Sequence, residues 1–144
     1  MIEIHRTALI LAPAKAVYDI INDIEVYPQF LDGVVSAQIL EHSSTHMLGQ
    51  LVIKKAGVEK TIVTRNKLIE PTTIDMTLEQ GPLDSLSGVW TITPLSDQGC
   101  KVALDLSFSV KKGIKAIAFG AVFKQVANSM VDSFVQRANE LHPS

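Results

Sequence analysis

The sequence feature that most constrains the fold is a long amphipathic segment near the end of the chain, residues 113–141. Its apolar residues recur three and four positions apart: Phe119, Val122, Phe123, Val126, Ala127, Met130, Phe134, Ala138 and Leu141. This spacing places them on one stripe of an α-helix, which packs against a core. Such a helix spans about 40 Å, more than a domain of this size needs to close its core. Because strand patterns dominate the preceding chain, we predict a sheet curved around this helix.

The first two turns of this helix are also apolar outside the stripe, at Ile114 and Ile117. Three lysines flank them: Lys111, Lys112 and Lys115. One interpretation is a helix start that a loop covers. The other is an apolar, cationic rim at the mouth of a cavity, suited to a lipid surface or a lipid-like ligand. Gly113 and Gly120 would allow this section to move.

The chain before the helix divides into short elements. A strand over residues 3–11 precedes two short helical segments, 14–24 and 27–31, and turn residues separate six further strands: 35–41, 47–55, 58–69, 73–78, 86–93 and 100–110. A loop is expected over residues 80–85. Adjacent hairpins form an antiparallel sheet, and helices that cover one face give an α+β domain. We therefore predict one domain over residues 1–144, with about seven strands and an apolar pocket beside the long helix.

Composition narrows the class of protein. A chain of 144 residues that is 47% hydrophobic is enough to form one core. Its net charge of −2 gives no overall attraction to nucleic acid, so DNA is not an expected partner. No apolar run is long enough to span a membrane, and Met1 opens no signal-peptide pattern. With a lone cysteine, Cys100, the chain is expected in the cytoplasm, with peripheral contact to the inner membrane as an option.

Motifs for catalysis are missing from the sequence. His42 and His46 are four residues apart but flank a turn, so we predict no metal site. The sequence has no glycine-rich phosphate loop, no nucleophile elbow and no helical pair of carboxylates facing a pocket. Binding without catalysis, and without a required cofactor, is therefore the expected activity.

Apolar and aromatic side chains provide the candidates for a ligand cavity. We expect the lining to include Phe30, Met76, Leu78, Trp90, Phe119, Phe123 and Met130. We expect its mouth to be formed by Leu83, Leu86, Ile114 and Ile117. Trp90, the only tryptophan, can also be interpreted as a core anchor.

Basic residues cluster on two predicted strands: Lys54, Lys55, Lys60, Arg65 and Lys67. If Lys55 opposes Lys60 across the turn at Ala56 and Gly57, the set lies on exposed faces of neighbouring strands. A solvated face is the default interpretation. Contact with RNA phosphates is the functional alternative.

Several ordered motifs together resemble a known family. They are Arg6-Thr-Ala8, Tyr27-Pro-Gln-Phe-Leu31, Lys55-Ala-Gly57, Thr64-Arg-Asn66, Gly81-Pro82-Leu83, Trp90-Thr-Ile-Thr-Pro-Leu95 and Phe119-Gly120…Phe123-Lys124. Over essentially the whole chain they resemble the START-like proteins of the coenzyme-Q-binding and RatA toxin group, in its compact bacterial branch. The resemblance implies the helix-grip fold. The chain departs from the family pattern at Asp32-Gly33-Val34, where Pro and Cys are usual, and at Leu83, where Phe is usual.

The resemblance implies two different functions. Mitochondrial relatives bind ubiquinone and support respiration as carriers, so a non-enzymatic carrier of an isoprenoid quinone is our first expectation. RatA-type proteins are toxins that associate with the large ribosomal subunit and block its joining to the small one, which is the alternative. A polyketide cyclase or dehydrase activity is a third reading, but it rests on a shared fold alone.

Overall fold

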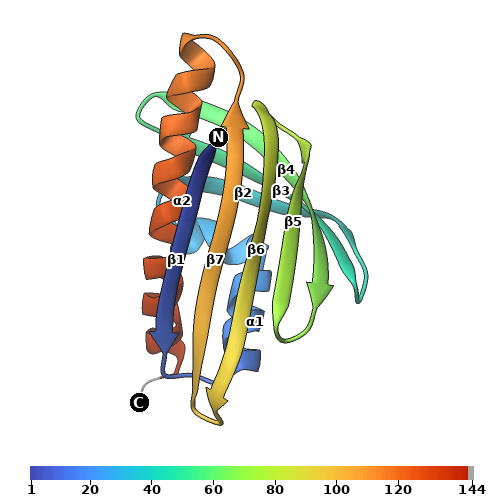
Figure 1. Cartoon of the computed structure of the whole chain (residues 1–144), viewed down its shortest axis with the longest axis vertical. Coiled ribbons are helices and arrows are strands. Elements are labelled where there is room, and N and C mark those ends of the chain that lie inside the picture. Colours follow the sequence, from blue (N-terminus) through green and yellow to red (C-terminus); the bar gives the residue numbers. More distant parts are fainter. Residues whose placement is uncertain (143–144) are drawn as a thin grey trace.

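The computed structural model describes residues 1–142, and its centre is a seven-stranded antiparallel sheet curved around one long helix (Figure 1). The strands are β1 (Ile2–Ile10), β2 (Val34–His42), β3 (His46–Lys55), β4 (Val58–Ile69), β5 (Thr73–Gln80), β6 (Leu83–Ser96) and β7 (Gly99–Val110). The helices are α1 (Ala14–Asn22), the 3₁₀ helix η1 (Ile24–Gln29) and α2 (Ile114–Leu141). Across the sheet the order is β1-β7-β6-β5-β4-β3-β2, so β2 to β7 form a meander and β1 closes it beside β7.

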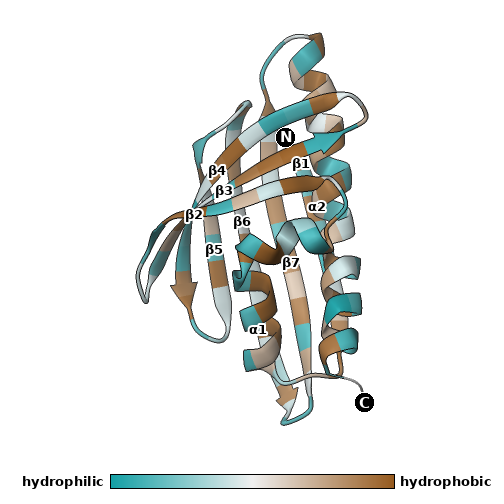
Figure 2. Cartoon of the chain, turned by 180° about the vertical axis from the view of Figure 1, so that it is seen from behind, coloured by the Kyte–Doolittle hydropathy of each residue, from teal (hydrophilic) through white to brown (hydrophobic). Residues whose placement is uncertain are grey.

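All helices lie on one side of the sheet, where α1 and η1 stand beside α2 (Figure 2). Strand β7 shows why this face is the buried one. Every second residue of β7 is buried: Cys100, Val102, Leu104, Leu106 and Phe108. Alternation of this kind directs one set of side chains toward the helices and the other toward solvent. The α+β helix-grip fold predicted from the sequence is thereby confirmed.

Helix α2 buries the predicted stripe with two adjustments. Val131, which the periodic pattern omits, is 1% exposed, whereas Leu141 at the end of the helix is 51% exposed. Met130 is half-buried because it stands at the edge of the stripe, beside the cavity described below. The helical period of 3.6 residues makes a straight stripe drift, so neighbouring positions exchange places at its edges.

The predicted loop over residues 80–85 is wrong, because only Gly81 and Pro82 connect β5 to β6. Val63 pairs with Gln80, which keeps β5 in the sheet to its last residue. Leu83 pairs with Val110, which brings the start of β6 into the ladder with β7. Local turn residues therefore suggested a longer loop than long-range strand pairing allows.

Two contacts fix α2 against the strands. Gly120 faces Val110, whose Cγ1 lies 2.4 Å from the position that a Cβ on Gly120 would occupy. Gly120 therefore allows close packing of helix and strand, and the mobility expected at Gly113 and Gly120 stays a prediction. On the edge strand β1, next to β7, the Arg6 guanidinium donates hydrogen bonds to the Asn128 carbonyl at 2.8 Å and to Asp132 Oδ1 at 2.7 Å.

Candidate functional site

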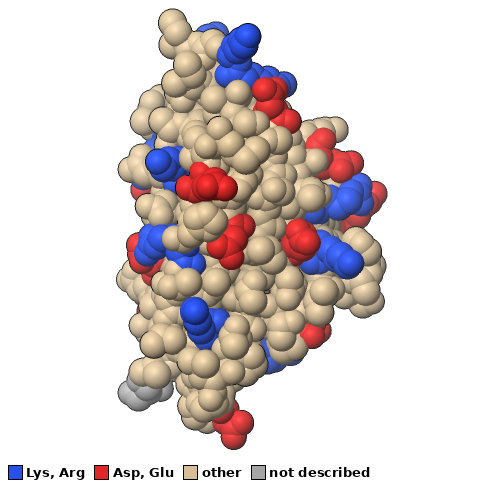
Figure 3. All heavy atoms as spheres, in the orientation of Figure 1, with Lys and Arg blue, Asp and Glu red and all other residues tan. Residues whose placement is uncertain are grey.

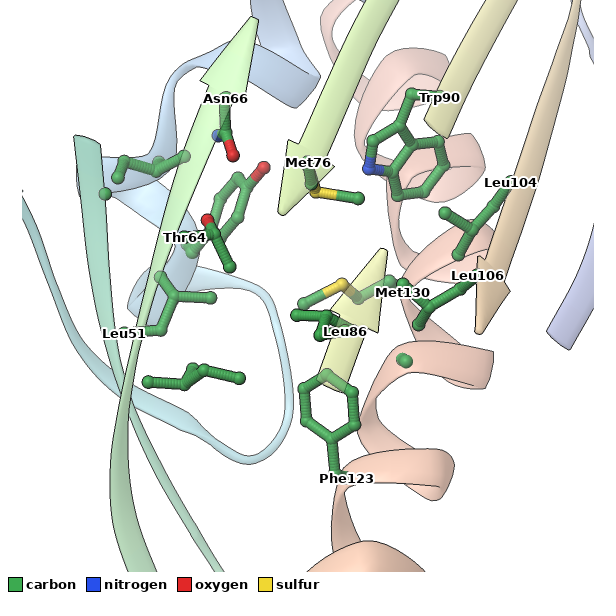
Figure 4. Close-up of a pocket in the computed structure, with 15 residues that line it drawn as sticks. Leu51, Thr64, Asn66, Met76, Leu86, Trp90, Leu104, Leu106, Phe123 and Met130 are labelled. Atoms are coloured by element: carbon green, nitrogen blue, oxygen red, sulfur yellow. The ribbon is translucent and has the colours of Figure 1, made fainter. Parts of the chain in front are cut away.

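A cavity of about 80 Å³ lies between the concave face of the sheet and α2 (Figure 4). Strands β3 to β7 supply most of its wall, η1 supplies one corner and α2 closes it. The lining residues are Ile24, Tyr27, Gly49, Leu51, Ile62, Thr64, Asn66, Met76, Leu86, Trp90, Leu104, Leu106, Phe123, Ala127 and Met130. The volume is about half of the roughly 150 Å³ that holds benzene in an engineered apolar cavity. A larger ligand would require side chains to move.

Four of the seven predicted lining residues surround this cavity: Met76, Trp90, Phe123 and Met130 (Figure 4). Two of them are methionines, whose unbranched, flexible side chains adapt to ligands of different shape. Trp90 is 3% exposed and contacts Phe134 edge-on, with ring centroids 5.3 Å apart. It therefore serves both as a core anchor and as a wall of the cavity.

The other three predicted lining residues lie elsewhere. Phe119 is fully buried behind Phe123, with stacked rings 5.8 Å apart, so it supports the wall without forming it. Leu78 packs against the core outside the lining. Phe30 packs on Phe134 with ring centroids 5.7 Å apart, and the Arg137 guanidinium lies 5.2 Å from the Phe30 ring centroid. Phe30 therefore lies behind the cavity wall, outside the lining.

The predicted mouth is not formed as expected. Leu86 lines the cavity, but it is 6% exposed and belongs to the wall. Leu83 is a core residue outside the lining, because its pairing with Val110 draws it into the sheet. Ile114 and Ile117 are 88% and 62% exposed and are absent from the lining. These two isoleucines form an exposed apolar surface at the start of α2.

Most of the β-strand side of the cavity was not predicted from the sequence. Leu104 and Leu106 line the cavity, although only a strand over residues 100–110 was predicted there. Thr64 and Asn66 were overlooked because polar residues in an alternating strand are usually exposed. Their position in the strand would have indicated them. Thr64 and Asn66 alternate with Ile62 and Leu68 along β4, so all four share the face on which Ile62 and Leu68 are buried.

Asn66 is the one polar feature that stands out in this wall. It is 6% exposed, and its Oδ1 has no hydrogen-bond partner among the described residues. No Asp, Glu, His, Lys, Arg or Cys occurs among the lining residues. Tyr27 also belongs to the lining, but its hydroxyl donates a hydrogen bond to the Ile21 carbonyl, and burial raises the pKa of this phenol. The cavity is thus suited to binding and lacks a paired acid and base.

The predicted basic set is divided between the two faces of the sheet. Lys55 pairs with Val58, and Lys60 pairs with Ile53, so the expected opposition of Lys55 and Lys60 is wrong. Strand alternation places these two lysines on the helix side. The remaining three residues lie on the outer face: Lys54, Arg65 and Lys67.

Acidic neighbours also offset the positive charge of the predicted basic set. Lys55 forms an ion pair with Asp32, and Arg65 donates to Glu79 at 3.2 Å, which lowers the pKa of that carboxyl group. Two more pairs of opposite charge face each other across neighbouring strands: Lys54 with Glu59, and Lys67 with Asp75. Most of the predicted RNA-facing charge therefore lies beside an opposite charge.

Within residues 1–142, no group of three or more His, Cys, Asp or Glu side chains is placed to hold a metal ion. None of the described helices has the length and hydropathy needed to cross a bilayer.

Comparison with known proteins gives the relationship of the chain. Residues 10–135 match the family model described as polyketide cyclase / dehydrase and lipid transport. The ribosome association toxin RatA of Pseudomonas aeruginosa is 40% identical over 139 residues, covering 96% of both chains. RatA of Escherichia coli K12 is 40% identical over 142 residues, which are 99% of this chain and 90% of that protein.

More distant similarities extend the same relationship. The mitochondrial coenzyme Q-binding protein COQ10 of Dictyostelium discoideum is 28% identical, covering 92% of this chain and 66% of that protein. The Zhui aromatase/cyclase of Streptomyces sp. R1128 superposes with a TM-score of 0.84 over 99% of this chain and 96% of its own, at 18% identity. This last likeness is one of fold alone. The chain therefore belongs to the polyketide cyclase / dehydrase and lipid transport family of START-like proteins, and the RatA proteins are its homologues.

Proposed function

We propose that this protein is a cytoplasmic, ribosome-directed factor that binds the large ribosomal subunit and hinders its joining to the small subunit. The observation that carries the proposal is the 40% identity to ribosome association toxins, which extends over nearly the whole length of both chains. The START-like fold alone would not distinguish this role from that of the aromatase/cyclase neighbours.

The surface that we assign to this contact is the tip of the molecule where α2 begins. It comprises three lysines and two isoleucines: Lys111, Lys112, Ile114, Lys115 and Ile117. Basic atoms gather at this end in Figure 3, which has the orientation of Figure 1. All three lysines are exposed, and none of them forms an ion pair within residues 1–142.

A local patch is needed because the whole molecule carries a net charge of −2 and has no general attraction to RNA. Lysines without acidic partners can each replace a counterion on a phosphate, which makes binding sensitive to salt. The tip satisfies this requirement better than the sheet set, whose cations mostly lie beside carboxylates.

Co-sedimentation with purified large subunits tests this assignment. The tip variant replaces Lys111, Lys112 and Lys115 by Glu, and a matched control replaces Lys54, Arg65 and Lys67 on the outer sheet face by Glu. The wild type should sediment with the subunits and be released as salt rises, the tip variant should stay in the supernatant, and the sheet variant should still bind. Loss of binding in the sheet variant alone would assign the contact to the sheet, and a wild type that never sediments would contradict the proposal.

We also propose that the cavity binds a neutral, hydrophobic small molecule without converting it. The apolar lining supports this second role, and the similarity to a coenzyme Q-binding protein makes an isoprenoid quinone such as ubiquinone one candidate. A cavity of about 80 Å³ would hold only part of such a molecule, so Met76 and Met130 would have to move aside.

Native mass spectrometry tests the second role. Protein purified gently from a quinone-producing host should carry a noncovalent mass that is lost on denaturation. An empty protein that also takes up no added quinone would exclude the quinone and leave the ribosomal role standing.

A further inference from the structure

We infer that Asn66 is the polar anchor of the cavity and that the ligand carries an uncharged hydroxyl group, as in a phenol, a hydroquinone or an alcohol. This inference rests on the proposal that the cavity binds a hydrophobic molecule. It adds the chemical class of the head group and the residue that would recognise it.

The burial of Asn66 is exceptional for this protein. Within residues 1–142 it is the only buried residue among the Asn, Gln, Ser, Thr, Asp, Glu, Lys, Arg and His side chains. Its Oδ1 has no hydrogen-bond partner there. Because a buried acceptor without a donor costs free energy, an apolar residue would stabilise the fold better at this position. An amide kept here is therefore best explained by a partner that arrives from outside the chain.

The position of Asn66 directs the amide toward a ligand. It belongs to the lining, on the cavity face of β4, and Figure 4 shows its side chain beside the cavity with Met76 next to it. Asn66 pairs with Met47 on one side and Met76 on the other. Flexible thioether side chains on both sides can shift to admit a ring or chain beside the amide. Thr64, two residues earlier, adds a second polar group to the same wall.

The composition of the lining restricts the head group to neutral ones. No Lys, Arg or His lines the cavity, so a carboxylate or phosphate would be buried without a counter-charge, at a large desolvation cost. The free Oδ1 favours a ligand with a donor, which an ether or an ester lacks. Among quinone ligands this favours the reduced hydroquinone, because a quinone carbonyl could only accept from the amide nitrogen. A hydroxyl group supplies the donor, and it can also accept a hydrogen bond from the amide nitrogen. The remainder of the ligand must be apolar to match the other walls.

Two probes that differ only at the oxygen test this inference: para-butylphenol, which can donate, and para-butylanisole, in which a methyl group replaces the hydroxyl hydrogen. The fluorescence of Trp90, the only tryptophan and itself a lining residue, reports binding. The wild type should bind the phenol on the order of tenfold more tightly than the anisole, although the anisole is the more hydrophobic compound.

The variant Asn66→Leu should bind both probes with similar affinity and unfold at the same or a higher temperature. Asn66→Ala repeats the test should the leucine fill the cavity. The matched control is Asn139→Leu, an exposed position of α2 outside the lining, which should keep the preference for the phenol. Equal binding of both probes by the wild type, or a preference that persists in both Asn66 variants, would overturn the anchor. Failure of the wild type to bind either probe would overturn the ligand proposal and the anchor with it, while ribosome binding would remain a separate question.

Discussion

At the scale of single residues, Gly88 shows how closely the cavity wall is packed. A Cβ at Gly88 would lie 2.4 Å from Leu106 Cδ1 and 3.3 Å from both Met76 Cε and the Asp105 carbonyl oxygen. Two lining side chains from the neighbouring strands therefore fill the space over this glycine. The absence of a side chain at position 88 lets Leu106 and Met76 reach the cavity.

Gly88→Ala is accordingly expected to destabilise the fold by roughly 1–3 kcal/mol and to weaken binding of apolar probes, because the methyl group forces both side chains to shift. The control is Gly99→Ala in β7, where the nearest atom to a new Cβ is 3.6 Å away and φ is not positive. Urea unfolding measures both variants. Equal stability of the two would show that Leu106 and Met76 adjust freely.

The candidate site was predictable from the sequence in part, and the residues explain where prediction failed. Met76, Trp90, Phe123 and Met130 are apolar residues on inward strand or stripe positions, so pattern and position agree. Phe119 follows the same pattern but lies one turn earlier in α2, where it is covered by Phe123. Asn66 was missed because polarity normally indicates exposure, and only the tertiary structure shows that it is buried.

At the scale of elements, the edge strand β1 is joined to the middle of α2 by one arginine. Arg6 reaches the Asn128 carbonyl and Asp132, and its side chain is 29% exposed while that of Asp132 is 71% exposed. The exposed carboxylate limits the strength of the ion pair, but the hydrogen bond to a helix carbonyl remains. We expect this contact to hold the sheet edge against the helix.

A double-mutant cycle with Arg6→Met and Asp132→Asn tests that contact. The coupling between the two side chains should be about 0.5–1 kcal/mol and should decrease with salt. The pair Lys15 and Asp19, exposed on α1, provides the comparison and should couple less strongly. A coupling near zero for Arg6 and Asp132 would mean that the hydrophobic stripe alone positions α2.

The elements themselves were largely predictable, since α2 and the alternating β7 have long, regular patterns. The region between β5 and β6 was not. Its Gly, Pro, Asp and Ser residues favour a loop locally, yet pairing of Leu83 to Leu86 with β7 extends the strand through them. Pairing between strands distant in sequence is not encoded in the local composition.

At the scale of the whole molecule, the apolar cavity and the cationic tip lie in different places. The apolar cavity lies within the curve of the sheet, whereas the cationic tip stands at the start of α2 and contributes no residue to the lining. Variants at either place should therefore affect one activity without the other. The fold is shared with proteins of very different description, so function must be read from these two places.

Subunit joining tests the central claim most directly. Purified small and large ribosomal subunits are mixed under conditions in which they join, with and without the protein, and are separated on a sucrose gradient. Wild-type protein should keep the subunits separate and lower the fraction of joined ribosomes in proportion to its concentration. Asn66→Leu should do the same, and the variant with Lys111, Lys112 and Lys115 replaced by Glu should not. An unchanged fraction of joined ribosomes at saturating wild-type protein would contradict the account.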